Sequence, residues 1–143
     1  MSECRVLLVD DEVDFVEVLA DRLEARGLQV TQCHNGKEAL DAATAKAFDA
    51  IVLDMAMPGM DGIETLERLL EINPDLQVIL LTGRATPHQA ATAIRVGALD
   101  LMEKPADLDT LLSLIETAAT KRWSLEEKRI EKKVADIMRK KGW

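Results

Sequence analysis

The chain has 143 residues, of which 48% are hydrophobic and 31% are charged, and its formal net charge is −8. One domain of about this length buries roughly 68–70% of its unfolded surface, which excludes disordered, collagen-like and disulfide-scaffold proteins. The apolar runs are far shorter than the about 20 residues of a membrane span, and the first residues lack the pattern of a secretory signal. We therefore expect a soluble, cytoplasmic protein that does not insert into a membrane.

Charge divides the chain near residue 120. Residues 1–120 carry 22 acidic and 9 basic side chains, whereas residues 121–143 carry 9 basic and 4 acidic ones. An acidic body disfavours direct DNA binding and suits a cation where carboxylates converge. The sequence thus predicts a domain over residues 1–120 and a separate basic tail over residues 121–143.

Short apolar runs alternate with segments of helical spacing along the predicted domain. Apolar residues recur at helical spacing in each interval between the runs and after the last one, which predicts five helices. Because parallel strands need crossovers of helix length, this pattern predicts an α/β fold with a doubly wound five-stranded parallel sheet. The strands are expected at residues 5–9, 28–33, 50–53, 76–81 and 99–102.

Polar side chains follow four of the predicted strands directly. Asp10, Asp11 and Glu12 follow the first strand, Asp54 the third, Thr82 the fourth and Lys104 the fifth. In doubly wound sheets, ligands bind outside the carboxyl ends of the strands, so these side chains are expected to converge.

Each of these residues also has a purely structural explanation. The acidic pair after the first strand suits a helix N-terminus, Asp54 a turn, Thr82 a strand end and Lys104 a solvated charge. Their joint placement, with complementary chemistry at the ends of different strands, favours a functional site.

Four motifs also resemble a known family. The runs Leu8-Val-Asp-Asp-Glu12, Val52-Leu-Asp54 through Gly62, Leu81-Thr-Gly83 and Lys104-Pro105 are similar, in this order, to the receiver domain of bacterial two-component response regulators. The similarity covers about residues 4–120. It implies the flavodoxin-like strand order 2-1-3-4-5 and a cis bond between Lys104 and Pro105.

The resemblance assigns roles to the acidic residues. It implies that Asp54 is the phosphoacceptor for a histidine kinase or phosphotransfer protein. It also implies that Asp11, Asp54 and the backbone carbonyl of Ala56 bind Mg²⁺, with Asp10 assisting through water or a hydrogen bond. Mg²⁺ prefers oxygen ligands and binds through one or two carboxylates plus phosphate, which agrees with these assignments.

Thr82 and Lys104 complete the catalytic set that the resemblance implies. The ammonium of Lys104 stabilises charge on the transferring phosphoryl group, and the hydroxyl of Thr82 hydrogen-bonds a phosphoryl oxygen once Asp54 is modified. Many receivers carry Tyr or Phe three residues before the lysine, where this chain has Leu101. The aromatic part of the usual switch is therefore missing.

In the tail, the helical spacing of apolar residues among basic ones predicts an amphipathic helix that continues from the helix over residues 108–115. Three interpretations remain open: packing on the acidic body, pairing in a dimeric coiled coil, and binding an acidic partner, nucleic acid or membrane. The tail is too short for a helix-turn-helix domain, so we expect a protein effector and no direct DNA binding. Its apolar stripe consists of Trp123, Ile130, Val134, Ile137 and Met138.

Two other functions compete with a phosphorylation-dependent switch. A phosphorylation-independent scaffold with a receiver fold does not need the complete polar set at the strand ends. A small phosphohydrolase needs a substrate-binding element that the sequence does not show. We therefore expect a phosphoacceptor protein in a phosphorelay rather than an enzyme that acts on a separate substrate.

Overall fold

The sheet consists of five parallel strands in the order β2-β1-β3-β4-β5, in a computed structural model that describes residues 4–142. Each strand overlaps the apolar run that predicted it, and both the α/β fold and the strand order are confirmed. The strands are β1 (Arg5–Val9), β2 (Gln29–Cys33), β3 (Ala50–Asp54), β4 (Val78–Thr82) and β5 (Asp100–Glu103).

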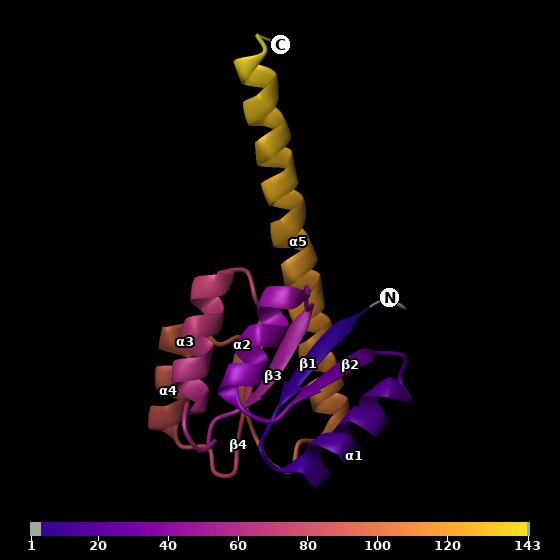
Figure 1. The fold of residues 1–143 in the computed structure, drawn as a ribbon, viewed down its shortest axis with the longest axis vertical. Coiled ribbons are helices and arrows are strands. Elements are labelled where there is room, and N and C mark those ends of the chain that lie inside the picture. The colour runs from indigo at the N-terminus through magenta and orange to yellow at the C-terminus, as the bar shows by residue number, and fades with distance from the viewer. Residues whose placement is uncertain (1–3, 143) are drawn as a thin grey trace.

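Five helices connect and flank the strands (Figure 1). They are α1 (Val13–Glu24), α2 (Gly36–Ala45), α3 (Gly62–Ile72), α4 (Pro87–Val96) and α5 (Leu108–Lys140). In the last four, a side chain before the first turn accepts a hydrogen bond from the third backbone N–H of the helix, which satisfies a group that the helix itself leaves unpaired. These capping residues are Asn35, Asp61, Thr86 and Asp107.

Alternate residues of the central strands face two cores on opposite sides of the sheet. Val6 and Leu8 of β1 pack into the core formed with α1 and α5, whereas Leu7 and Val9 pack into the core formed with α2, α3 and α4. All four side chains are buried. Burial on both faces explains why the strands are continuous apolar runs rather than alternating ones.

The carboxyl ends of β1, β3, β4 and β5 meet at one edge of the sheet. Asp54 is paired with Leu81, and Thr82 with Glu103, so the residues after these strands are neighbours. The Lys104–Pro105 peptide bond is cis, as the resemblance implied. No described helix has an apolar stretch long enough to cross a membrane.

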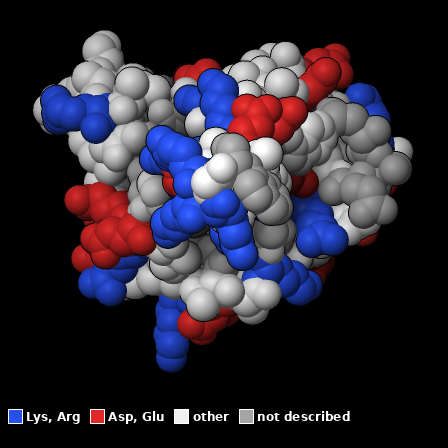
Figure 2. Space-filling model, turned by 90° about the horizontal axis from the view of Figure 1, so that it is seen from above, with Lys and Arg blue, Asp and Glu red and all other residues white. Residues whose placement is uncertain are grey.

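Helix α5 begins in the core and then leaves the body of the protein. Its first turns bury Leu111, Ile115, Ala118 and Ala119, and Trp123 packs at the edge of the same core. The rest of the helix projects away from the sheet (Figure 1). Viewed from above, in Figure 2, Lys and Arg side chains gather around this end of the molecule. The prediction of one continuous basic helix is confirmed.

Asp49, the residue before β3, anchors α5 where it leaves the core. Its Oδ1 accepts hydrogen bonds from Trp123 Nε1 at 2.8 Å and Arg122 Nη1 at 3.1 Å, and its Oδ2 accepts one from Arg5 N at 2.9 Å. Two turns further along the helix, Arg129 forms an ion pair with Asp75. The base of the tail is therefore held on the body at two points.

Candidate functional site

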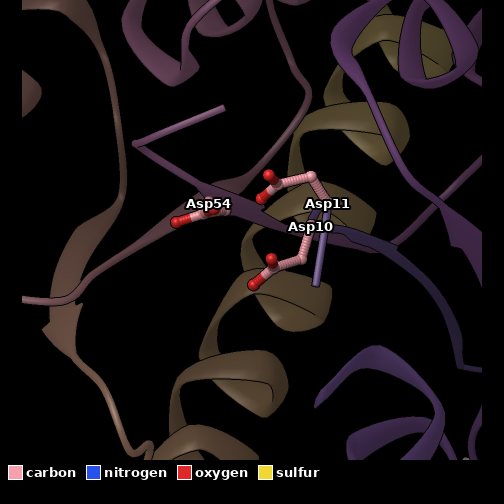
Figure 3. Close-up of side chains that lie close together, drawn as sticks. All are labelled: Asp10, Asp11 and Asp54. Carbon is pink, nitrogen blue, oxygen red and sulfur yellow. The ribbon is translucent and has the colours of Figure 1, made fainter. Parts of the chain in front are cut away.

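Three carboxylates converge beyond the carboxyl ends of β1 and β3. Asp10 and Asp11 follow β1, and Asp54 ends β3. Each offers one oxygen, and these oxygens all lie within 4.8 Å of one another. Figure 3 shows the three side chains side by side. Asp10 and Asp54 are buried, whereas Asp11 is exposed, so the cluster is open to solvent on one side.

Lys104 brings a positive charge into this cluster from β5. Its Nζ lies 2.6 Å from Asp10 Oδ2, 3.0 Å from Glu12 Oε1 and 3.4 Å from Asp54 Oδ1. Burial opposes the charged ammonium, but the contacts with the carboxylates of Asp10 and Glu12 outweigh it and raise the pKa of Lys104 above its ordinary value. The ammonium therefore stays charged at neutral pH.

The pKa of Asp54 is raised from 3.8 to about 6. Burial is the main cause and the neighbouring charge of Asp10 the second, while Lys104 and the backbone N–H of Ala56 favour the charged form less strongly. The hydrogen bond from Ala56 N to Asp54 Oδ1 is long, at 3.4 Å. The Asp54 carboxylate is therefore poorly compensated by the protein.

Asp10 offers the clearest sign that the cluster suits a cation. Its Oδ1 accepts a hydrogen bond from Glu12 N at 2.9 Å, but its buried Oδ2 has no hydrogen-bond partner within the described residues. Lys104 Nζ faces this oxygen as an ion-pair partner, 2.6 Å away. Clustered carboxylate oxygens with spare lone pairs are the ligands that Mg²⁺ prefers, and the residues present fit this ion.

Thr82 ends β4 beside the cluster, with its hydroxyl engaged locally. Thr82 Oγ1 donates to Arg84 O at 3.2 Å and accepts from Arg84 N at 3.3 Å. The next residue of the loop is also held, because Ala85 N donates to Glu103 Oε1 at 3.1 Å. A hydrogen bond from this hydroxyl to a group on Asp54 would therefore replace its bond to Arg84 O.

The segment after Asp54 turns back against the strand end. Gly62 N donates to Met55 O at 2.9 Å, and a Cβ on Gly62 would lie 2.5 Å from Met55 Cα and 2.6 Å from Asp54 O. No side chain fits there without moving the backbone. Gly62 thus allows the turn that positions the backbone around Ala56.

The structure brings together the side chains that the sequence predicted, namely Asp10, Asp11, Asp54, Thr82 and Lys104. Glu12, which the sequence also placed after the first strand, contacts Nζ. Sequence reasoning missed one neighbour of the lysine, Phe15, whose ring centroid lies 4.7 Å from Nζ, within the range of a cation–π interaction. Phe15 lies in the first turn of α1, where an aromatic residue suits core packing equally well, so the sequence held no signal for this contact.

Comparisons with known proteins agree with this geometry. Residues 6–116 match the family described as "Response regulator receiver domain". An uncharacterized transcriptional regulatory protein, YkoG, of Bacillus subtilis (strain 168) is 38% identical over 118 residues, which cover 82% of this chain and 52% of the relative. The chain thus spans about half the length of that relative.

Solved structures have the same fold. A CheY-like receiver domain protein from Methanospirillum hungatei JF-1 has a TM-score of 0.79 at 26% identity, over 85% of this chain and 97% of that one. A response regulator protein from Burkholderia pseudomallei was crystallised with a phosphorylated aspartic acid, a calcium ion and citrate. It has a TM-score of 0.75 at 30% identity, over 93% of this chain and 85% of that one. By its sequence profile, its strand order and its acidic cluster, this chain belongs to the receiver domain family of response regulators.

Proposed function

We propose that this chain is a two-component signalling switch that accepts a phosphoryl group on Asp54. The observation that supports this role most strongly is the environment of Asp54. Its carboxylate is buried, poorly hydrogen-bonded and flanked by the charges of Asp10 and Lys104. A group with a perturbed pKa at the carboxyl end of a doubly wound sheet is a strong candidate for chemistry.

The donor in the proposed reaction is a phosphohistidine on a histidine kinase or phosphotransfer protein. One oxygen of Asp54 attacks the phosphorus, the bond between phosphorus and the imidazole nitrogen breaks, and the nitrogen leaves with that electron pair and takes up a proton. An acyl phosphate remains on Asp54. A bound Mg²⁺ supplies positive charge that offsets the carboxylates and the phosphoryl oxygens. We assign Asp10, Asp11, Asp54 and the backbone carbonyl of Ala56 to holding this ion.

Lys104 and Thr82 act on the phosphoryl group itself in this proposal. Lys104 already lies 3.4 Å from Asp54 Oδ1, held by Asp10, Glu12 and the Phe15 ring, so its charge is in place before the reaction. Thr82 must first release Arg84, and this exchange of hydrogen bonds moves the loop before α4. The movement carries the signal although Leu101 replaces the usual aromatic residue.

We further propose that residues 1–120 are the switch and residues 121–143 a segment with its own role. By family resemblance, the signalling surface is formed by α4, β5 and α5. We infer a protein effector, with no direct DNA contact by this chain. The buried free thiols of Cys4 and Cys33 suit a reducing compartment, so we place the switch in the cytoplasm.

Intact mass after incubation with acetyl phosphate and Mg²⁺ tests this function. We expect one added phosphoryl group in the wild-type chain and none in Asp54→Asn or without the cation. Asp49→Asn is the matched control, because it changes the other buried aspartate adjoining the same strand and should still be phosphorylated. A folded wild-type chain that gains no phosphoryl group from acetyl phosphate or phosphoramidate would favour the phosphorylation-independent scaffold.

A further inference from the structure

The end of α5 exposes an apolar stripe that nothing in the body covers. Ile130, Val134, Ile137 and Met138 are 58%, 49%, 47% and 43% exposed. Arg129 contacts the body through Asp75. Further along the helix, within the described residues, the ion pair joins two residues of α5 itself, Arg139 and Asp136. Because helices in proteins owe most of their stability to packing an apolar face, this isolated stripe calls for a partner.

The stripe has the spacing of a helix-pairing seam. Ile130, Val134 and Ile137 are separated by four and then three residues, which is the heptad pattern of a coiled coil. One further step in each direction along this seam reaches Glu127 and Lys141. At 1.5 Å per residue, residues 126–141 span about 24 Å, which lets two such helices lie side by side.

The two charges at the ends of the seam favour one orientation of a second copy. A parallel pair places Glu127 beside Glu127 of the second copy and Lys141 beside its Lys141, and like charges at such positions are unfavourable. An antiparallel pair places each Glu127 beside a Lys141, twice by symmetry. We propose that the projecting end of α5, residues 126–141, pairs in antiparallel fashion with the same segment of a second copy of this chain.

The distribution of the basic residues favours a second copy over an anionic membrane. Successive residues of a helix are rotated by 100°, so Lys128, Lys132 and Arg139 lie on the face opposite the apolar stripe. A helix lying in a membrane surface places basic residues beside its apolar face, where they reach the lipid headgroups. Here the flanking positions include Glu126, Glu131 and Lys133, and the seam itself ends in Glu127 and Lys141. The apolar face is therefore bordered by acidic as well as basic side chains, which does not favour an anionic surface.

Sedimentation equilibrium of the full-length chain over a range of concentrations tests the pairing. We expect a reversible dimer that Val134→Lys dissociates. Ile72→Lys is the matched control, because it places the same charge at a similarly exposed position on α3 and should leave the dimer intact. Circular dichroism confirms that each variant retains its helices. A wild-type chain that stays monomeric at every concentration overturns the proposal.

A charge exchange then tests the orientation. Glu127→Lys should raise the dissociation constant about tenfold by opposing Lys to Lys, and adding Lys141→Glu to the same chain should restore it. In a parallel dimer, Glu127→Lys only replaces one like-charge contact with another, and the second change rescues nothing. Absence of rescue therefore overturns the antiparallel assignment.

Cross-linking gives an independent measure of the same geometry. A mixture of Glu127→Cys and Lys141→Cys chains, treated with a short bismaleimide, should yield mainly the mixed dimer. The native thiols of Cys4 and Cys33 should not react, because both are buried and burial raises their pKa values to about 11. Predominant cross-links between identical positions would identify a parallel pair and overturn the proposal.

Discussion

The two ends of β3 each adjoin a buried aspartate, and the protein treats them differently. Asp49, before the strand, accepts hydrogen bonds from Arg5 N, Arg122 and Trp123 at 2.8 to 3.1 Å. Asp54, at the other end, accepts one backbone hydrogen bond at 3.4 Å and lies beside the charge of Asp10. The protein thus satisfies the carboxylate of Asp49, which stabilises the fold, with three hydrogen bonds. It leaves lone pairs of the Asp54 carboxylate available for a cation and a phosphoryl group.

Removing the carboxylate of Asp49 should have the largest effect on stability. Asp49→Ala leaves Arg122 and the Trp123 N–H without their acceptor at a largely buried position, and we expect the free energy of unfolding to fall by about 3 kcal/mol. Urea denaturation measures this change. Asp54→Ala should not lower the free energy of unfolding in the same assay. If both variants lower it equally, the distinction between the two ends of β3 is contradicted.

Much of the fold was predictable because its signals are local. Continuous apolar runs located the strands, and helical spacing located the helices, since burial on two faces or on one imposes those patterns. The convergence of Asp10, Asp54, Thr82 and Lys104 followed from their placement after parallel strands. No local signal predicted the order of the strands, which came from family resemblance rather than from the pattern of the residues.

The contacts that the sequence did not reveal join residues far apart in the chain. Asp49 precedes an apolar strand in the sequence and gives no sign of its bonds to Arg122 and Trp123, which are 73 and 74 residues away. The contact between Lys104 Nζ and the Phe15 ring likewise joins residues at opposite ends of the domain in sequence. Such pairings depend on where the strands and α5 end relative to one another, and a single sequence does not encode that in any periodic pattern.

A smaller effect of opposite sign is expected at the other end of β3. Because folding raises the pKa of Asp54 from 3.8 to about 6, its contribution to stability is full below pH 3.8 and is lost as the pH rises through about 6. Without Mg²⁺, Asp54→Asn should therefore be more stable than the wild-type chain at pH 7.5. The pKa difference corresponds to roughly 3 kcal/mol, and solvent screening at the open side of the cluster reduces the expected gain to about 2 kcal/mol. The two proteins should be equally stable below about pH 4.

Urea titrations in EDTA at these two pH values measure that difference. Asp61→Asn is a suitable control, because it changes another aspartate after β3 whose carboxylate caps α3 instead of facing the cluster. Equal stability of Asp54→Asn and the wild-type chain at pH 7.5 would show that Asp54 is better compensated than its contacts indicate.

The smallest effect concerns the fluorescence of Trp123 when Mg²⁺ binds. Trp123 contacts Asp49, and five residues of strand at about 3.3 Å each separate Asp49 from Asp54, or roughly 17 Å. An ion held by Asp54 leaves the indole hydrogen bond unchanged at that distance, so we expect no change in intensity beyond dilution. A Trp143→Phe background restricts the signal to Trp123. Quenching that saturates with Mg²⁺ in this background, and disappears in Asp54→Asn, would instead show that β3 couples its two ends before any phosphoryl group arrives.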